Sequence, residues 1–143
     1  MKLSMIAALC GVVFCASPAA AQADEWMQQV QAQLVEVAEA VGDEGMEIAG
    51  EPIGGSLDDG ETETVRIRIQ PGTYLIVGAC DADCSDLDLS LVSGGEEVDA
   101  DDAADDSPVL AIEVSEATTV TLRVHMASCS AEPCRFGVAA FSY

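Results

Sequence analysis

The stretch DLDLSLV, residues 86–92, alternates polar and apolar side chains without interruption. Its three leucines fall on one side of an extended chain, because successive side chains of a strand point to opposite faces. Asp86 and Asp88 fall on the other side. A strand with one apolar and one polar face is typical of antiparallel sheets that have one face in water. The stretch therefore predicts a half-buried strand with both aspartates exposed.

The same alternation continues along most of the chain after residue 63. It predicts further strands at 64–70, 73–79, 96–99, 109–115, 118–126 and 135–142. Segment 73–79, TYLIVGA, is apolar almost throughout and is therefore predicted to be buried. Turn residues such as Pro71-Gly72 and Gly94-Gly95 separate the strands. We predict a mainly β fold, an antiparallel β-sandwich preceded by one N-terminal α-helix.

The helix is expected at residues 24–42. Apolar side chains recur there at spacings of three and four, which is the pattern of a single helical stripe: Met27, Val30, Leu34, Val37 and Val41. Asp24 is the expected N-cap, and Gly42 is the expected stop. The stripe predicts that the helix packs either on its own domain or on a partner. Residues 43–61 are rich in glycine and acidic residues, and we predict a linker or loop with one short strand at 46–49.

The N-terminal residues have the features of a secretory signal peptide. A positive residue is followed by an apolar run at 3–16 and by small residues that end in Ala21-Gln22-Ala23. This order predicts cleavage before Asp24, with cleavage before Gln22 as the alternative. We therefore expect residues 1–23 to be removed. The protein is then expected to be periplasmic or secreted in a bacterium, with no membrane span after the signal is removed.

The chain is strongly acidic. It has 26 acidic and 5 basic residues, and its net charge is −21. Removal of residues 1–23 leaves four arginines against the same 26 acidic residues, a net charge of −22. Such a charge repels nucleic acid and anionic membranes, so we expect neither as a partner. It favours cations and basic proteins. Half of the residues are hydrophobic, which indicates a folded domain rather than a disordered chain.

Four cysteines remain after removal of the signal: Cys80, Cys84, Cys129 and Cys134. An even number of cysteines in a small exported domain predicts two disulfides, which three pairings would satisfy. We favour Cys80–Cys84 and Cys129–Cys134, because each pair brackets a short polar turn. A zinc site with four cysteine ligands is the alternative, although the spacings and the oxidising compartment favour disulfides.

Four segments of the β-part resemble the bacterial pre-peptidase C-terminal domain: PGTYLIVGA at 71–79, DLDLSLVSGGEEVDADD at 86–102, SPVLAIEV at 107–114 and TTVTLRVHM at 118–126. The resemblance covers residues 62–143 and implies a small jelly-roll-like sandwich, as found on secreted proteases and other exported proteins. It also implies a non-catalytic accessory module for binding, or for the folding and export of an attached enzyme. The chain departs from the family pattern at Ala117-Thr118-Thr119, where a second G-x-Y strand opening is expected, and in its paired cysteines.

Acidic side chains gather on the strand at 86–92 and in the loop after the next strand. Antiparallel neighbours would bring such carboxylates together, and calcium prefers six to eight oxygen ligands. We therefore predict a structural calcium ion, with these candidate ligands: Asp86, Asp88, Asp99, Asp101 and Asp102. The alternative is an acidic face that only contacts water. Paired catalytic carboxylates would need a substrate cleft, which the sequence does not indicate.

The sequence contains no motif for catalysis. His125 is the only histidine and is expected on the surface, and the motifs G-x-S-x-G and H-E-x-x-H are missing. Oxidised cysteines supply no thiol nucleophile. We predict a non-enzymatic, exported binding module whose protein or glycan partner the sequence does not name. The alternative is a protein partner of a secreted enzyme, acting as its inhibitor or its escort.

Overall fold

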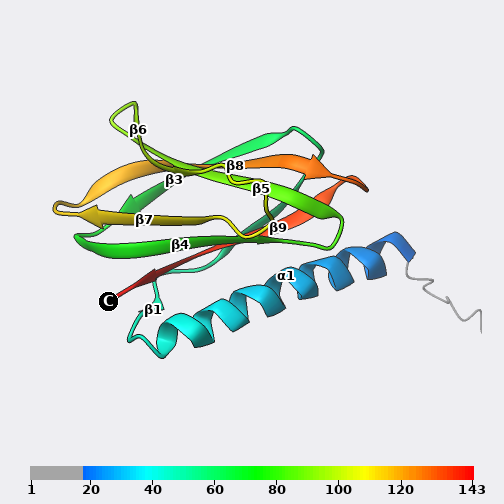
Figure 1. The fold of residues 1–143 in the computed structure, drawn as a ribbon, viewed down its shortest axis with the longest axis horizontal. Coiled ribbons are helices and arrows are strands. Elements are labelled where there is room, and N and C mark those ends of the chain that lie inside the picture. Colours follow the sequence, from blue (N-terminus) through cyan, green and yellow to red (C-terminus); the bar gives the residue numbers. More distant parts are fainter. Residues whose placement is uncertain (1–17) are drawn as a thin grey trace, which may run out of the picture.

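A computed structural model describes residues 18–143, with side chains from Glu25 onward. The predicted signal peptide lies outside the described residues except for its last six positions. The described chain forms two antiparallel sheets packed face to face, with one helix against the outside of one sheet (Figure 1). The predicted β-sandwich preceded by one α-helix is therefore confirmed.

The first sheet has five strands in the order β1-β9-β4-β7, with β2 also paired to β9. Its strands are β1 (Glu47–Ile48), β2 (Ile53–Leu57), β4 (Gly72–Cys80), β7 (Val109–Val114) and β9 (Cys134–Ser142). The second sheet has four strands in the order β3-β8-β5-β6. Its strands are β3 (Thr62–Ile69), β5 (Cys84–Ser93), β6 (Glu96–Asp101) and β8 (Thr118–Cys129). Every strand predicted after residue 63 is present.

The main hydrophobic core lies between the two sheets. Leu87, Leu89 and Leu91 of β5 are buried in it, which confirms the alternation predicted for DLDLSLV. Side chains from the inner faces of the neighbouring strands complete this core, among them Leu110, Leu122, Val124, Met126 and Phe136. Burial of these apolar side chains is the main term that holds the sheets together.

A second, smaller core lies between the first sheet and the helix α1 (Pro18–Gly42). Val30 and Leu34 of the helix pack there against Val77 of β4 and Phe141 of β9. The helix stripe therefore packs on its own domain, the first of the two predicted alternatives. Strands β4 and β9 are covered on both faces, which explains why TYLIVGA is apolar almost throughout. Among residues 18–143, no helix combines the length and the apolar character that crossing a bilayer requires.

The predicted start of the helix is wrong. Residues 18–23 are already helical, so Asp24 lies within the helix rather than at its N-cap.

The predicted loop at 43–61 is also wrong in part. The short strand expected near 46–49 is present as β1, but β2 was not expected, and both strands pair with β9. Gly54-Gly55 indicated a loop, yet these glycines allow β2 to approach β9 closely. A Cβ on Gly55 would lie 2.9 Å from the ring of Phe136, its register partner.

The two disulfides are Cys80–Cys84 and Cys129–Cys134, which confirms the local pairing. The cysteines are thus bonded to each other and do not form the alternative zinc site. Cys84 and Cys129 are register partners on β5 and β8, so both bridges lie at the same end of the sandwich. The backbone N–H and the hydroxyl of Ser130 both donate to the carbonyl oxygen of Asp83, at 2.8 and 2.9 Å, and join the two bridged turns. Two disulfides in a domain of this size indicate an oxidising setting.

We predict that Gly137→Ala weakens the docking of the helix. A Cβ at Gly137 would lie 2.7 Å from Cγ1 of Val30 and 3.0 Å from Cδ1 of Leu34. Forcing extra volume into this contact is expected to lower the free energy of unfolding by about 1–3 kcal/mol, measured by urea denaturation.

Gly54→Ala is the matched control. Gly54 is the register partner of Gly137, but the nearest atom to a Cβ there would lie 3.5 Å away. The control is expected to leave stability nearly unchanged. Equal losses in the two variants would contradict the close contact of helix and strand.

Candidate functional site

The outer face of the second sheet carries the two aspartates of DLDLSLV. The register places Asp88 opposite His125, and His125 opposite Thr62. Nδ1 of His125 lies 2.9 Å from the hydroxyl oxygen of Thr62 and 3.2 Å from the carbonyl oxygen of Glu61. The three side chains therefore form one row across β5, β8 and β3, and His125 lies on the polar face as predicted.

A shallow hollow of about 250 Å³ surrounds this row. Its lining includes Thr62, Asp88, Ser90, Glu97, Asp101, Asp102, Arg123 and His125. In a hydrolytic triad, an acid holds one ring nitrogen of the histidine and the nucleophilic hydroxyl contacts the other. Here Nδ1 makes the contact with the hydroxyl and also the contact with a backbone carbonyl. The row therefore lacks the arrangement of a triad.

Asp99 and Asp101 of β6 point to the opposite side of the same sheet. Their register partners are Leu91 and Leu89, and partners in a sheet share a face. Because these leucines point into the core, the two carboxylates point inward at the edge of the sandwich, toward β7. Asp86 and Asp88, by contrast, alternate with the buried leucines of β5, and both are half-buried rather than exposed as predicted.

The inward carboxylates connect the two sheets. Asp101 accepts a hydrogen bond of 2.8 Å from the backbone N–H of Val109, and Asp99 accepts one of 2.8 Å from that of Ala111. Both N–H groups belong to β7, the edge strand of the first sheet. An unpaired edge strand can pair with a strand of another molecule and cause aggregation. The two aspartates satisfy this edge with side-chain oxygens instead of a further strand.

The five aspartates predicted to bind calcium thus do not form one cluster. Asp99 and Asp101 bind β7, and their remaining oxygens accept bonds from the backbone N–H groups of Ala100 and Ala103. Asp102 lines the outer hollow together with Asp88. Within residues 18–143, no three histidine, cysteine or acidic side chains are placed to hold a metal ion together. Calcium binding stays a prediction, and of its five candidate ligands Asp88, Asp101 and Asp102 line the outer hollow.

The carboxyl group of Asp88 has a raised pKa in the folded protein. Partial burial raises the pKa of the Asp88 carboxyl above its ordinary value of 3.8, and the neighbouring Asp86 carboxylate raises it further, against the influence of His125. Oδ1 of Asp86 is itself buried and has no hydrogen-bond partner among the described residues. Ionised Asp88 is therefore unfavourable for the folded state at neutral pH.

Two aspartates that the sequence reasoning did not single out are structural acceptors at the disulfide end. Asp81 is 2% exposed, and its carboxylate accepts hydrogen bonds from the backbone N–H groups of Asp83, at 3.2 Å, and Arg135, at 2.6 Å. Asp59 accepts a 2.7 Å bond from the N–H of Cys129. The signal was the position of both residues in short polar turns, where aspartate commonly bonds the backbone.

An apolar patch lies on the outer face of the first sheet, beside the helix. The helix packs on β9 and β4 and leaves β7 uncovered. Ala111 and Val109 of β7 are register partners of Leu75 and Val77, so they share the outer face, and Val109 is 44% exposed. We use the name outer patch for this surface, which also includes the half-buried helix residues Val37 and Val41.

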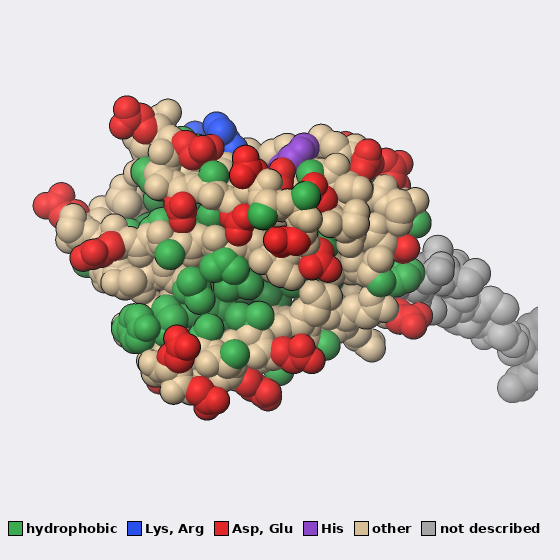
Figure 2. All heavy atoms as spheres, viewed as in Figure 1, with side chains coloured by type: hydrophobic (Ala, Val, Ile, Leu, Met, Phe, Trp, Pro, Cys, Tyr) green, Lys and Arg blue, Asp and Glu red, His purple; other side chains and the backbone are tan. Residues whose placement is uncertain are grey.

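Acidic side chains frame the outer patch. Figure 2 shows it as a recessed apolar area between the helix and the sandwich, with carboxylates on both sides. The exposed acidic residues of the flanking segments are Glu36, Glu39, Asp43 and Glu44 on the helix side and Asp105, Asp106, Glu113 and Glu116 around β7. A partner that covers this surface therefore meets an apolar centre and a negative rim.

No protein-family model matches the chain, and no curated protein matches its sequence. The resemblance to the pre-peptidase C-terminal domain therefore stays a prediction.

We predict that Asp101→Ala opens the edge between β6 and β7. The variant leaves the N–H of Val109 without its acceptor, and losing a hydrogen bond to a charged group costs about 1–3 kcal/mol of stability. Urea denaturation measures this loss, and amide hydrogen exchange is expected to accelerate at Val109. Asp102→Ala removes the same charge from an exposed neighbour and is the control. Equal losses in both variants would show that charge, rather than the bond to β7, is responsible.

We predict that Asp88→Asn stabilises the protein at neutral pH in the presence of EDTA. A raised pKa means that the folded state holds the Asp88 proton more tightly than the unfolded state does. The resulting stability is present below the ordinary pKa and is lost as the pH rises through the raised one. The advantage of Asp88→Asn is therefore expected at about pH 7 and absent at about pH 3. Melting temperatures across this range check it.

Glu96→Gln controls for the loss of one negative charge elsewhere on the same sheet. It is expected to give a smaller gain than Asp88→Asn, and a gain of equal size would refute the local cause. The same variants measured in calcium test the predicted ion. A calcium ion held by Asp88 would make Asp88→Asn destabilising in calcium, whereas identical melting temperatures in calcium and EDTA would exclude it.

Proposed function

We propose that this chain is an exported, non-catalytic accessory domain that binds a basic amphipathic segment of a protein partner. The observation that supports this proposal is the outer patch, an apolar surface framed by carboxylates. Exposed apolar patches with a polar rim are typical of protein-interaction sites. The proposal joins the two functions expected from the sequence, a binding module and a partner of a secreted enzyme.

The composition of the patch defines the chemistry of the partner. Its centre consists of aliphatic side chains on β4, β7 and the helix, so the partner segment needs aliphatic or aromatic side chains on one face. Its rim is negative, so lysine or arginine is needed on both sides of that face. An amphipathic helix or strand with basic flanks satisfies both conditions.

The net charge supports the same partner at longer range. A chain of −22 after signal removal attracts basic proteins and speeds their approach, and this effect weakens as salt increases. The rim charges then act at short range, within a screening length of about 8 Å at physiological salt. Attraction by the whole molecule and recognition by the patch therefore favour the same class of protein.

Inhibition and escort are the two uses that such binding would have for a secreted enzyme. The two disulfides fit work in an oxidising setting, and the resemblance to pre-peptidase C-terminal domains supports an accessory role. A calcium ion bound through Asp88 would stabilise the second sheet and would not contribute to the patch.

A designed peptide tests the proposal directly. We expect the purified protein to bind a labelled amphipathic helix of leucine and lysine, with affinity that falls as salt rises. A counterpart with glutamate in place of every lysine is expected not to bind. Fluorescence anisotropy measures both. The proposal is wrong if the lysine peptide does not bind, or if both peptides bind equally.

Two arginine variants distinguish the outer patch from general charge attraction. Ala111→Arg places a bulky cation within the patch, whereas Val35→Arg places the same side chain at an exposed apolar position of the helix, outside the stripe that packs on the sheet. We expect Ala111→Arg to weaken binding by at least about tenfold, because interface energy is concentrated in few central contacts. Val35→Arg is expected to change it little. Equal effects would mean that the patch is not the binding surface.

A further inference from the structure

A second cleft opens between the two sheets, at the edge where β1 and β2 of the first sheet face β3 of the second. Its volume is about 400 Å³. Inner-face side chains from both sheets line it, and nearly all are apolar: Ile53, Ile67, Ile69, Tyr74, Ile76, Val120, Leu122, Val138 and Ala140. The cleft is therefore an extension of the main core that remains open to the outside.

The opening has a structural cause. Strands β1 and β2 pair with different parts of β9, and residues 49–52 between them continue neither strand. The inner-face residues Ile53 and Ile67 are consequently only half-buried, although they pack against the core. At the other edge Asp99 and Asp101 bind β7, and a separate hollow of about 400 Å³ lies beside that strand, with Val98, Ala111 and Val114 in its lining. The two edges differ in chemistry: carboxylates bridge the sheets at that edge, whereas mainly apolar side chains line this cleft.

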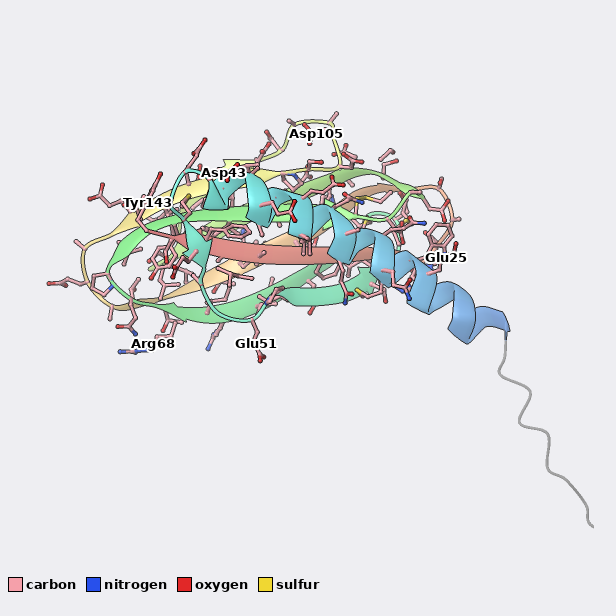
Figure 3. All side chains as sticks on the ribbon, turned by 90° about the horizontal axis from the view of Figure 1, so that it is seen from below. Glu25, Asp43, Glu51, Arg68, Asp105 and Tyr143 are labelled. Carbon is pink, nitrogen blue, oxygen red and sulfur yellow. A yellow bond between two sulfur atoms is a disulfide. The ribbon has the colours of Figure 1, made fainter. Side chains whose placement is uncertain are left out.

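The polar groups of the cleft lie at its mouth. They are Glu51 from the β1–β2 connection, Arg68 from the end of β3, and Gln70. Figure 3 shows Glu51 and Arg68 projecting from the same edge of the molecule, opposite the edge that carries Asp105. The hydroxyl of Tyr74 donates to the backbone oxygen of Gln70 at 3.0 Å, so its ring serves as part of the wall.

The charge at the mouth differs from that of the whole molecule. Strand β3 carries Arg66 and Arg68, two of the four arginines in a chain that is otherwise strongly acidic. Because the rest of the charge is screened beyond about 8 Å at physiological salt, Arg68 acts locally on a group at the mouth. The guanidinium group of arginine pairs with a carboxylate through two parallel hydrogen bonds.

We propose that this cleft binds a small amphiphile, an apolar chain or ring that carries one carboxylate. The apolar part lies between the sheets, and the carboxylate meets Arg68 at the mouth. The volume falls within the range of about 300–1,000 Å³ that small-ligand sites occupy, and an apolar wall with few polar groups is typical of them. This site is distinct from the outer patch, and its existence does not depend on the proposed function.

Decanoate and decylamine test the proposal, because both are ten-carbon amphiphiles and they differ in the charge of the head group. Both are titrated below their micelle concentrations by calorimetry and by amide NMR shifts of the cleft residues. We expect saturable binding of one decanoate per chain and weaker binding of decylamine. Absence of saturable decanoate binding, or equal binding of the two, would overturn the proposal.

Three charge variants define the role of the mouth. Arg68→Gln is expected to weaken decanoate binding about tenfold, and Glu51→Gln is expected to strengthen it, because it removes the carboxylate that repels the ligand. Arg66→Gln is the matched control, since Arg66 has the same charge on the same strand but does not line the cleft. Equal losses from the two arginine variants would exclude recognition at the mouth.

Filling the cleft tests whether the alkyl chain of the ligand lies there. Ile67→Trp is expected to abolish decanoate binding, and Ala140→Met serves the same purpose if the tryptophan variant does not fold. Unchanged binding in a folded variant would overturn the proposal. Binding of the lysine peptide to the outer patch is expected to persist in these variants, so a failure of the cleft and a failure of the proposed function are separate results.

Discussion

The rest of the structure depends on the burial of β9 on both of its faces. One face contributes Phe136 and Val138 to the core between the sheets, and the other contributes Ala139 and Phe141 to the core beneath the helix. Glycine at 137 lets the helix approach this strand closely. Three strands of the same sheet also pair with β9. The strand thus joins both cores. The outer patch exists because the helix covers β9 and β4 but does not reach β7.

Aspartate has several structural uses in this chain. Asp81, Asp99 and Asp101 accept backbone hydrogen bonds at the disulfide end or between the sheets. These carboxylates do what a carbonyl oxygen of a neighbouring strand would otherwise do. The acidic residues therefore include a group that holds the fold and a larger group that faces solvent. The solvent-facing group supplies the field that the proposed basic partner would meet.

Much of the fold was predictable because its signals are local. Alternation located the strands, the spacing of the stripe located the helix, and short turns between cysteines identified the bridges. Strand β2 was not predicted because glycine is a weak strand signal. Gly55 is needed there because the ring of Phe136, far along the chain, leaves no room for a Cβ. The sequence also did not show that Asp99 and Asp101 lie on the opposite face of the sheet from Asp86 and Asp88, for a similar reason. Asp99 faces β7 because of the register of β6 with β5 and because of the packing of the two sheets. Neither can be read from the residues around Asp99.

The two disulfides lie at one end of the sandwich, where Gln33 of the helix also donates a hydrogen bond of 2.8 Å to the carbonyl oxygen of Cys80. Covalent and polar links are therefore concentrated at that end, while the two-residue strand β1 and the C-terminal Tyr143 lie at the other. Local opening of the native state would begin where the links are fewest. A protease in the surroundings would therefore cut first near β1, and the end that carries the disulfides would survive longest as a resistant fragment.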